Sequence, residues 1–143
     1  MSAKAILYPM MAMVLLTVIV SIVMYRRRVA EMRAKRIRPQ EVASATAMAT
    51  KLEDTSAADH FRNLFETPVR FYAAVLAVYA TRITDPLDVG LAWLYVAARI
   101  AHTLIQCTSN IVLHRLKAFL LSWVILGILW GLIVWDLIVV GKS

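Results

Sequence analysis

The sequence predicts an all-α integral membrane protein built as a bundle of four helices. Hydrophobic residues make up 61% of the 143 residues and charged residues 17%, whereas a soluble domain has about 45 to 50% apolar and about 25% charged residues. The apolar residues also come in blocks instead of a stripe with the helical period, which is the pattern of helices that face lipid. A water-soluble globule is therefore disfavoured, and the length favours a single membrane domain over residues 1–143.

The first and last apolar blocks are the clearest membrane spans. Residues 5–25 carry no charge, and at about 1.5 Å per residue they are about 31 Å long, enough to cross a hydrocarbon core of about 30 Å. This block ends in an arginine triplet instead of a small-residue cleavage site, so a retained anchor is favoured over a signal peptide. The last span, residues 118–140, is interrupted by Asp136 alone.

Two further spans, residues 63–81 and 89–113, are long enough to cross but contain ionisable side chains. Polar turns at Asp85 and Pro86 and at residues 114–117 separate them from their neighbours. An alternative arrangement has two anchors around a soluble helical pair. It would expose the apolar residues 93–96 to water, so four spans are favoured.

The basic residues in the connections predict the orientation. Of the 16 Lys and Arg residues, eight lie in the connection 26–60 and two in the third connection, against three on the opposite side. Cytoplasmic connections carry the excess of Lys and Arg, so both termini are expected outside the cytoplasm, in a bacterial inner membrane or an endomembrane. The same charges attract anionic membrane lipid, and nucleic acid is not expected as a partner of so apolar a chain.

Charged side chains at membrane depth are costly, so they usually face the bundle interior and have a partner or a ligand. Helical spacing places two sets on common faces, namely Arg62, Glu66 and Arg70 in one helix and Arg99 with His102 in the next. One interpretation is an ion-pair network around Glu66 that helps the helices to associate. Because the nearby arginines outnumber this carboxylate, a small organic anion held by arginine forks is the favoured ligand.

The ordered motifs resemble those of the membrane-associated proteins in eicosanoid and glutathione metabolism, the MAPEG family. They are Arg62-Asn63-Leu64-Phe65-Glu66, then Arg99-Ile100-Ala101-His102, then Arg115 thirteen residues after the histidine. The resemblance implies a homotrimer of four-helix bundles that binds glutathione between subunits near the cytoplasmic face. It implies glutathione contacts from Arg62, Asn63, Glu66, Arg99 and His102, to which the charge argument adds Arg70, and it makes Arg115 the catalytic residue that stabilises the thiolate.

The function implied by this resemblance is a glutathione transferase or peroxidase acting on a lipophilic small molecule. One of Arg26, Arg27 and Arg28 could join the site, and the choice among them is open. Gln106 and Phe119 stand where eicosanoid-making members have tyrosines, which indicates a divergent, bacterial-type member whose second substrate is open.

The alternative is a non-enzymatic membrane assembly or scaffold protein of the same fold. A third interpretation, a channel for organic anions, is disfavoured because the outer halves of the helices are almost wholly apolar. No metal site is expected, because the three histidines are scattered along the chain.

Overall fold

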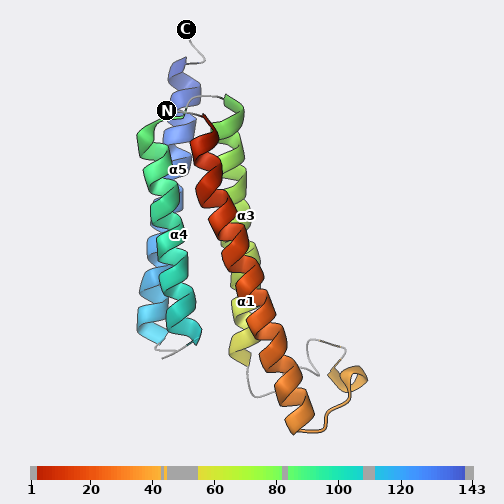
Figure 1. Cartoon of the computed structure of the whole chain (residues 1–143). Helices are drawn as coiled ribbons and strands as arrows, with labels where there is room; N and C mark the ends of the chain where they lie inside the picture. The colour runs from red at the N-terminus through yellow and green to blue at the C-terminus, as the bar shows by residue number, and fades with distance from the viewer. Residues whose placement is uncertain (1–2, 43, 45–54, 82–83, 108–111, 141–143) are drawn as a thin grey trace.

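The computed structural model describes residues 3–42, 44, 55–81, 84–107 and 112–140, without the side chains of residues 3, 39, 42, 55–65, 106–107, 112 and 140. Its four long helices are α1 (Leu7–Ala34), α3 (Thr55–Thr81), α4 (Pro86–Cys107) and α5 (Val112–Val140). Two short 3-10 helices, η1 (Ala3–Ile6) and η2 (Pro39–Val42), flank α1. The expected all-α fold with four helices is confirmed (Figure 1).

α1 joins a long apolar stretch to a charged extension. Its 28 residues give a length of about 42 Å, about 12 Å more than the hydrocarbon core. Pro9, Met13 and Val20 are buried, whereas apolar side chains such as Met11 and Leu15 are exposed. This surface suits lipid or a neighbouring subunit, and the segment Lys4–Ala34 is one of two candidate membrane helices.

α5 supplies the second candidate membrane helix, Leu113–Val139. Its polar residue Ser122 is fully buried and donates a hydrogen bond of 2.7 Å to the Phe119 carbonyl, so the hydroxyl is satisfied within the helix. Large apolar side chains cover much of its exposed surface, including Leu120, Leu121, Val124 and Ile128.

The start of α4 follows from its first residues. Pro86 is the first helical residue, where a missing N–H leaves no helical bond unmade. The Asp88 carboxylate accepts a hydrogen bond of 3.0 Å from the Asp85 backbone N–H, which is one half of a capping box. The turn expected at Asp85 and Pro86 therefore precedes the third long helix, as the sequence predicted.

α3 begins at Thr55, eight residues before the expected membrane span at residues 63–81, so the helix extends beyond that span. One helix boundary differs from the sequence expectations. The polar turn expected at residues 114–117 is wrong, since α5 begins at Val112 and contains them. Polarity alone does not end a helix, and His, Arg and Lys are tolerated within one. Residues 108–111, between α4 and α5, lie outside the described residues.

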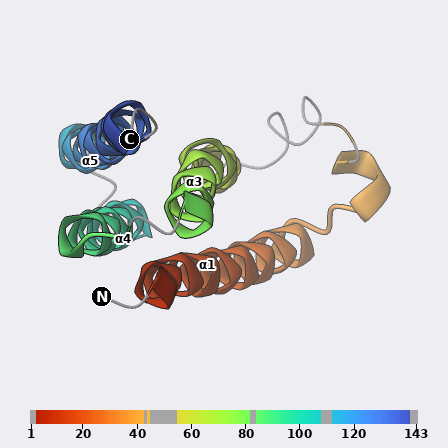
Figure 2. The ribbon, with the colours of Figure 1, turned by 90° about the horizontal axis from the view of Figure 1, so that it is seen from above.

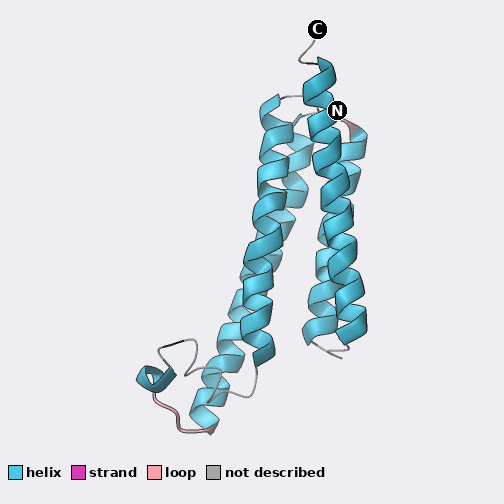
Figure 3. Cartoon of the chain, turned by 180° about the vertical axis from the view of Figure 1, so that it is seen from behind, coloured by secondary structure: helices cyan, strands magenta, loops and turns pink. Residues whose placement is uncertain are grey.

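The helices form two neighbouring pairs, α1 with α3 and α4 with α5 (Figures 1 and 2). The pairs lie close together near the N-terminus and spread toward the other end, where α1 runs on past the end of α4 (Figure 3). The buried core joins side chains of all four helices, among them Met13, Phe71, Val75, Tyr95, Val96, Leu126 and Leu129. We call the end of the bundle where α4 ends and α5 begins the basic end, and the opposite end, with Asp85, Asp88 and Asp136, the acidic end.

Candidate functional site

One face of α4 carries a buried polar strip that consists of Tyr95, Arg99, His102 and Thr103. Their spacing of four, three and one residues keeps them on the side of the helix that faces the bundle. Arg99 is 0% exposed and His102 is 1% exposed. A fully buried arginine is rare unless other groups compensate its charge. The two α4 residues predicted as ligand contacts therefore lie in the most polar part of the interior.

α3 packs against this strip through Thr67 and Phe71. The Phe71 ring stacks on the Tyr95 ring with a centroid separation of 4.4 Å and an interplanar angle of 14°. The Tyr95 hydroxyl lies near the fully buried Thr67 and within electrostatic range of Arg99. Within the described part of the chain, the Thr103 hydroxyl has no hydrogen-bond partner. A buried polar atom on the same face of α4 as Arg99 thus retains hydrogen-bonding capacity.

A row of side chains links His102 to the outer face of α3. The His102 and Phe119 rings lie 6.0 Å apart, and the Phe119 and Trp123 rings lie 6.3 Å apart. The Arg70 guanidinium then lies over the Trp123 ring, 4.8 Å from its centroid, in a cation–π contact between α3 and α5. Arg70 is therefore positioned by an aromatic side chain of another helix.

Glu66 and Arg70 do not face the interior, which corrects the sequence expectation. Both side chains are exposed in the single chain, because Thr67 and Phe71 occupy the inward face of α3 one residue further on. Among the described residues no ion pair joins Glu66 to Arg70. The side chain of Arg62, the other expected partner of Glu66, lies outside the described residues. An exposed charged face at this depth suits contact with a ligand or another subunit.

Arg115 is partly buried in the first turns of α5 and so lies at the same end as the α4 strip. Arg62 and Asn63 belong to the helical backbone of α3, but their side chains lie outside the described residues. Three helices thus bring Glu66, Arg70, Arg99, His102 and Arg115 to the basic end. With three arginines and a histidine against a single carboxylate, this set favours an anion over a cation.

Sequence reasoning missed the contributions of Thr67, Thr103 and Trp123. Thr103 could have been found from its spacing, since it lies four residues after Arg99 on the same face. Trp123 could not have been found in this way, because its contact with Arg70 depends on how α3 and α5 pack.

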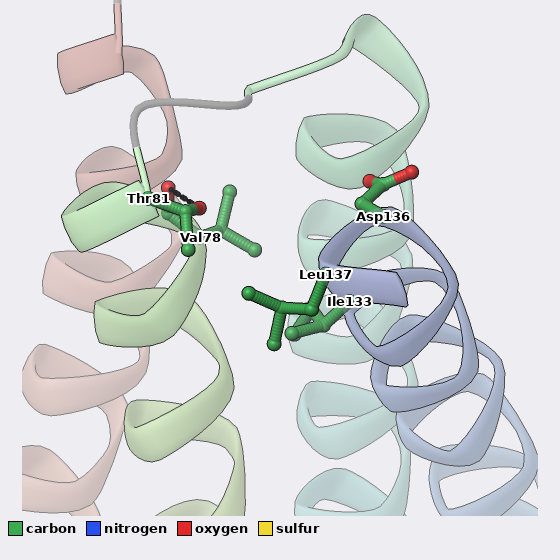
Figure 4. Close-up of a pocket in the computed structure, with 5 residues that line it drawn as sticks. All are labelled: Val78, Thr81, Ile133, Asp136 and Leu137. Carbon is green, nitrogen blue, oxygen red and sulfur yellow. Dashed lines mark hydrogen bonds between the residues drawn. The ribbon is translucent and has the colours of Figure 1, made fainter. Parts of the chain in front are cut away.

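The acidic end has a different character. A small cleft lies between the ends of α3 and α5, lined by Val78, Thr81, Ile133, Asp136 and Leu137 (Figure 4). The Thr81 hydroxyl donates to the Val78 carbonyl at 3.0 Å, so this polar group is satisfied within its own helix. Burial raises the pKa of Asp88, with a smaller increase from the nearby Asp136 carboxylate, while the hydrogen bond from Asp85 opposes the shift.

No group of three His, Cys, Asp or Glu side chains in the described residues could hold a metal ion. The polar groups of the basic end are arginine forks, hydroxyls and one imidazole, which suit an organic anion with several hydrogen-bonding groups.

The MAPEG family model matches residues 6–135, which include all four long helices almost completely. The chain belongs to the MAPEG family. Comparisons with curated proteins and with solved structures found no match. Membership confirms the resemblance carried by Arg62, Glu66, Arg99 and Arg115, and identifies the chain as a helical membrane protein of the family associated with glutathione and eicosanoid metabolism.

Proposed function

We propose that this MAPEG protein is a homotrimeric glutathione transferase or peroxidase that acts on a lipophilic substrate. The observation that carries the proposal is the buried Arg99 and His102 at the same end of the bundle as Glu66, Arg70 and Arg115. This combination in a chain of the MAPEG family matches the chemistry of glutathione.

Glutathione offers a complementary group for each type of side chain in the site. Its two carboxylates suit the forks of Arg70 and Arg99, and its ammonium group suits the Glu66 carboxylate. Arg62 and Asn63 would add contacts from the preceding turn of α3, as the family motif implies. His102 would donate or accept a hydrogen bond at the inner edge of the site.

Arg115 would act on the thiol of glutathione. A free thiol has a pKa of about 8.5, and a nearby cation favours the thiolate, which is the nucleophile. In a transferase reaction the thiolate sulfur forms a bond to an electrophilic carbon, and the leaving group departs with its electron pair. In a peroxidase reaction two glutathione molecules are oxidised to the disulfide while a hydroperoxide is reduced to an alcohol and water.

A second copy of the chain would complete the site. Glu66 and Arg70 are exposed in the single chain, and the long helices present large apolar side chains on the same outer surfaces. A trimer in which a neighbouring subunit covers this face would remove both from lipid and enclose the ligand. The apolar surface that remains would let a lipophilic substrate approach from the bilayer.

A thermal unfolding experiment tests glutathione binding. The detergent-purified protein is heated with and without millimolar glutathione, and with S-methylglutathione, which keeps the carboxylates and lacks the thiol. Ligand at about 100 times its Kd stabilises the native state by about 2.7 kcal/mol, so both compounds are expected to raise Tm. An unchanged Tm at saturating glutathione would remove the main support for the proposal.

The complete burial of Arg99 also favours a second candidate, a non-enzymatic membrane assembly protein of the same fold. In that case the internal charges serve only the specificity of subunit association. Glu66→Gln would then change the oligomer size measured by light scattering, while glutathione would leave Tm unchanged. The glutathione proposal makes the opposite prediction for the ligand.

A further inference from the structure

The Arg70 side chain of α3 has an aromatic partner in place of a carboxylate. Its guanidinium carbon lies over the Trp123 ring of α5, 4.8 Å from the ring centroid. Glu66, one helical turn earlier on the same face of α3, makes no ion pair with Arg70 among the described residues. Within the described part of the chain, the contact with Trp123 therefore determines where this guanidinium lies.

The location of Arg70 makes its charge costly. The side chain is exposed in the single chain, and it lies seven residues into the expected span 63–81, about 10 Å inside the hydrocarbon core. Charged side chains at such a depth usually pair with one another, with backbone carbonyls or with a ligand. A cation–π contact attracts the guanidinium to the ring but leaves its net charge in place. The contact therefore retains the full positive charge of Arg70 for an anion.

The aromatic partner also leaves the donors of Arg70 available. A guanidinium has five N–H donors in a planar fork that matches a carboxylate. A carboxylate side chain would occupy this fork with its oxygens, whereas an indole ring attracts a cation through its face and has no acceptor oxygen. Trp123 thus fixes the guanidinium without competing with a ligand for its N–H groups.

Trp123 is itself supported by a second ring. The Phe119 ring, one turn earlier on α5, packs edge-to-face against it with the centroids 6.3 Å apart. The His102 ring of α4 lies 6.0 Å from Phe119 on the other side. A guanidinium held by a supported ring loses less conformational freedom when a ligand binds, so this arrangement is expected to increase affinity.

Glu66 and Arg70 together indicate which part of the ligand they bind. The two side chains have opposite charges and lie four residues apart on one exposed face of α3. The γ-glutamyl end of glutathione carries an ammonium group and a carboxylate on the same carbon atom, so it presents opposite charges at a short separation. The glycyl end carries a carboxylate alone. The γ-glutamyl end is therefore the better match.

We propose that Trp123 is a positioning residue that holds Arg70 for the γ-glutamyl carboxylate of glutathione. The indole ring fixes the guanidinium, the N–H groups of Arg70 donate to the carboxylate, and the Glu66 carboxylate accepts the ligand ammonium group. This inference rests on the proposed function, because it takes glutathione as the anion. It gives a residue of α5 control over an affinity that α3 provides.

Isothermal titration of glutathione into the full-length protein in detergent tests the role of Trp123. Trp123→Leu removes the ring face and is expected to raise the Kd about fivefold, the effect of one cation–π contact. Trp123→Phe keeps a ring face and is expected to retain most of the affinity. Because the Trp123 side chain is 38% exposed, both variants are expected to fold. Trp135→Leu makes the same change at the acidic end of α5 and is expected to bind as the unmodified chain does.

A double variant shows whether Trp123 acts through Arg70. Arg70→Met removes the guanidinium and is expected to raise the Kd more than tenfold. Adding Trp123→Leu to Arg70→Met is expected to cause no further rise, because the ring then has no guanidinium to hold. A tryptophan that only stabilises the bundle would instead weaken binding equally in both backgrounds.

Two ligand analogues test the assigned end of glutathione. γ-Aminobutyryl-cysteinylglycine lacks only the γ-glutamyl carboxylate, and the glycyl ethyl ester of glutathione lacks only the charge of the glycyl carboxylate. Trp123→Leu is expected to raise the Kd for the ester about fivefold. The same variant is expected to leave the Kd for the γ-aminobutyryl compound unchanged.

An unchanged Kd for glutathione in Trp123→Leu, or a further rise when this change is added to Arg70→Met, would overturn the proposal. An equal rise in Trp135→Leu, or a rise for the γ-aminobutyryl compound as large as that for the ester, would also overturn it. In each of these cases the unmodified chain still binds glutathione, so the proposed function stands. Absence of glutathione binding by the unmodified chain would overturn both.

Discussion

At the acidic end of the bundle, the Asp88 carboxylate accepts a hydrogen bond from the backbone N–H of Asp85, three residues earlier at the start of α4. At the basic end, by contrast, the Arg70 guanidinium of α3 contacts an aromatic ring of another helix, that of Trp123 in α5. At the acidic end the Thr81 hydroxyl and the Asp88 carboxylate form hydrogen bonds with backbone groups of their own segments, while the Thr84 hydroxyl is buried without a partner among the described residues. The basic end gathers charged side chains from three helices with a single carboxylate among them.

Under the proposed function, this difference separates structural polar groups at the acidic end from ligand-binding groups at the basic end. Local capping requires only its own helix, so it forms with or without a partner. Cations that share one end of the bundle with a single carboxylate gain most when an anion binds. Substitutions at the basic end are therefore expected to change ligand binding or turnover, and those at the acidic end to change stability alone.

The largest effect is expected from Arg115→Ala. If Arg115 stabilises the thiolate, its loss lowers kcat by about 100-fold, as for the removal of one group that stabilises developing negative charge. The KM for glutathione changes much less, because other residues hold the carboxylates. Conjugation of glutathione to a generic electrophile measures both constants. Lys117→Ala, two residues further along α5, is the matched control, and unchanged turnover in Arg115→Ala would refute the role.

Arg99→Met is expected to separate stability from binding. Methionine fills much of the same volume without a charge, so the variant loses both the desolvation cost of the buried guanidinium and its interactions within the bundle. Because these two effects oppose each other, the Tm of the ligand-free variant should change little. The Kd for glutathione should rise more than tenfold, because a charge-assisted hydrogen bond contributes about 1.5 to 3 kcal/mol.

Isothermal titration of glutathione into both proteins measures this Kd. Arg99→Lys, which keeps the charge without the planar fork, should fall between them. A normal Kd in Arg99→Met would assign Arg99 to the structure of the bundle and would make the basic end resemble the acidic end.

Glu66→Gln is expected to have a smaller effect on the same Kd. The Glu66 side chain is exposed in the single chain and makes no ion pair with Arg70 among the described residues, so the ligand-free Tm should change little. Loss of the negative charge opposite the glutathione ammonium should raise the Kd about three- to tenfold. Asp136→Asn makes the same change of charge at the acidic end. An equal rise of the Kd in that control would indicate a general electrostatic effect instead of a contact.

The helices were predictable because long apolar blocks set their number and type, whereas the residues that end them are weaker signals. Residues 114–117 are polar but compatible with a helix, and α5 includes them. The inward orientation of Arg99 and His102 was also predictable, because a charged side chain in an apolar helix is costly unless it faces the interior of the bundle.

The orientation of Glu66 and Arg70 was not predictable in this way. Helical periodicity places residues on a common face but does not say whether the bundle, lipid or another subunit covers that face. The contact between Arg70 and Trp123 likewise depends on how α3 packs against α5, and the sequence of either helix alone does not predict that packing.

The smallest effect is expected at the acidic end, from Asp88→Asn. Because burial raises the pKa of Asp88 above its ordinary value, the folded state binds this proton more tightly than the unfolded state does. The stabilisation from that proton is complete below the ordinary pKa of aspartate, about 3.9, and is lost as the pH rises through the raised value.

At neutral pH the ionised Asp88 therefore costs stability, and asparagine removes this cost while its side-chain oxygen can still accept the Asp85 N–H. The Tm of Asp88→Asn should exceed that of the unmodified chain at pH 7, and the difference should shrink as the pH falls toward 4. Thermal unfolding between pH 4 and 8 measures this difference, with Glu66→Gln, which removes an exposed carboxylate at the basic end, as the control. If the Tm of Asp88→Asn and the Tm of the unmodified chain changed with pH in parallel, the pKa of Asp88 would be the same in the folded and unfolded states. Unchanged glutathione binding in Asp88→Asn would keep the two ends of the bundle distinct.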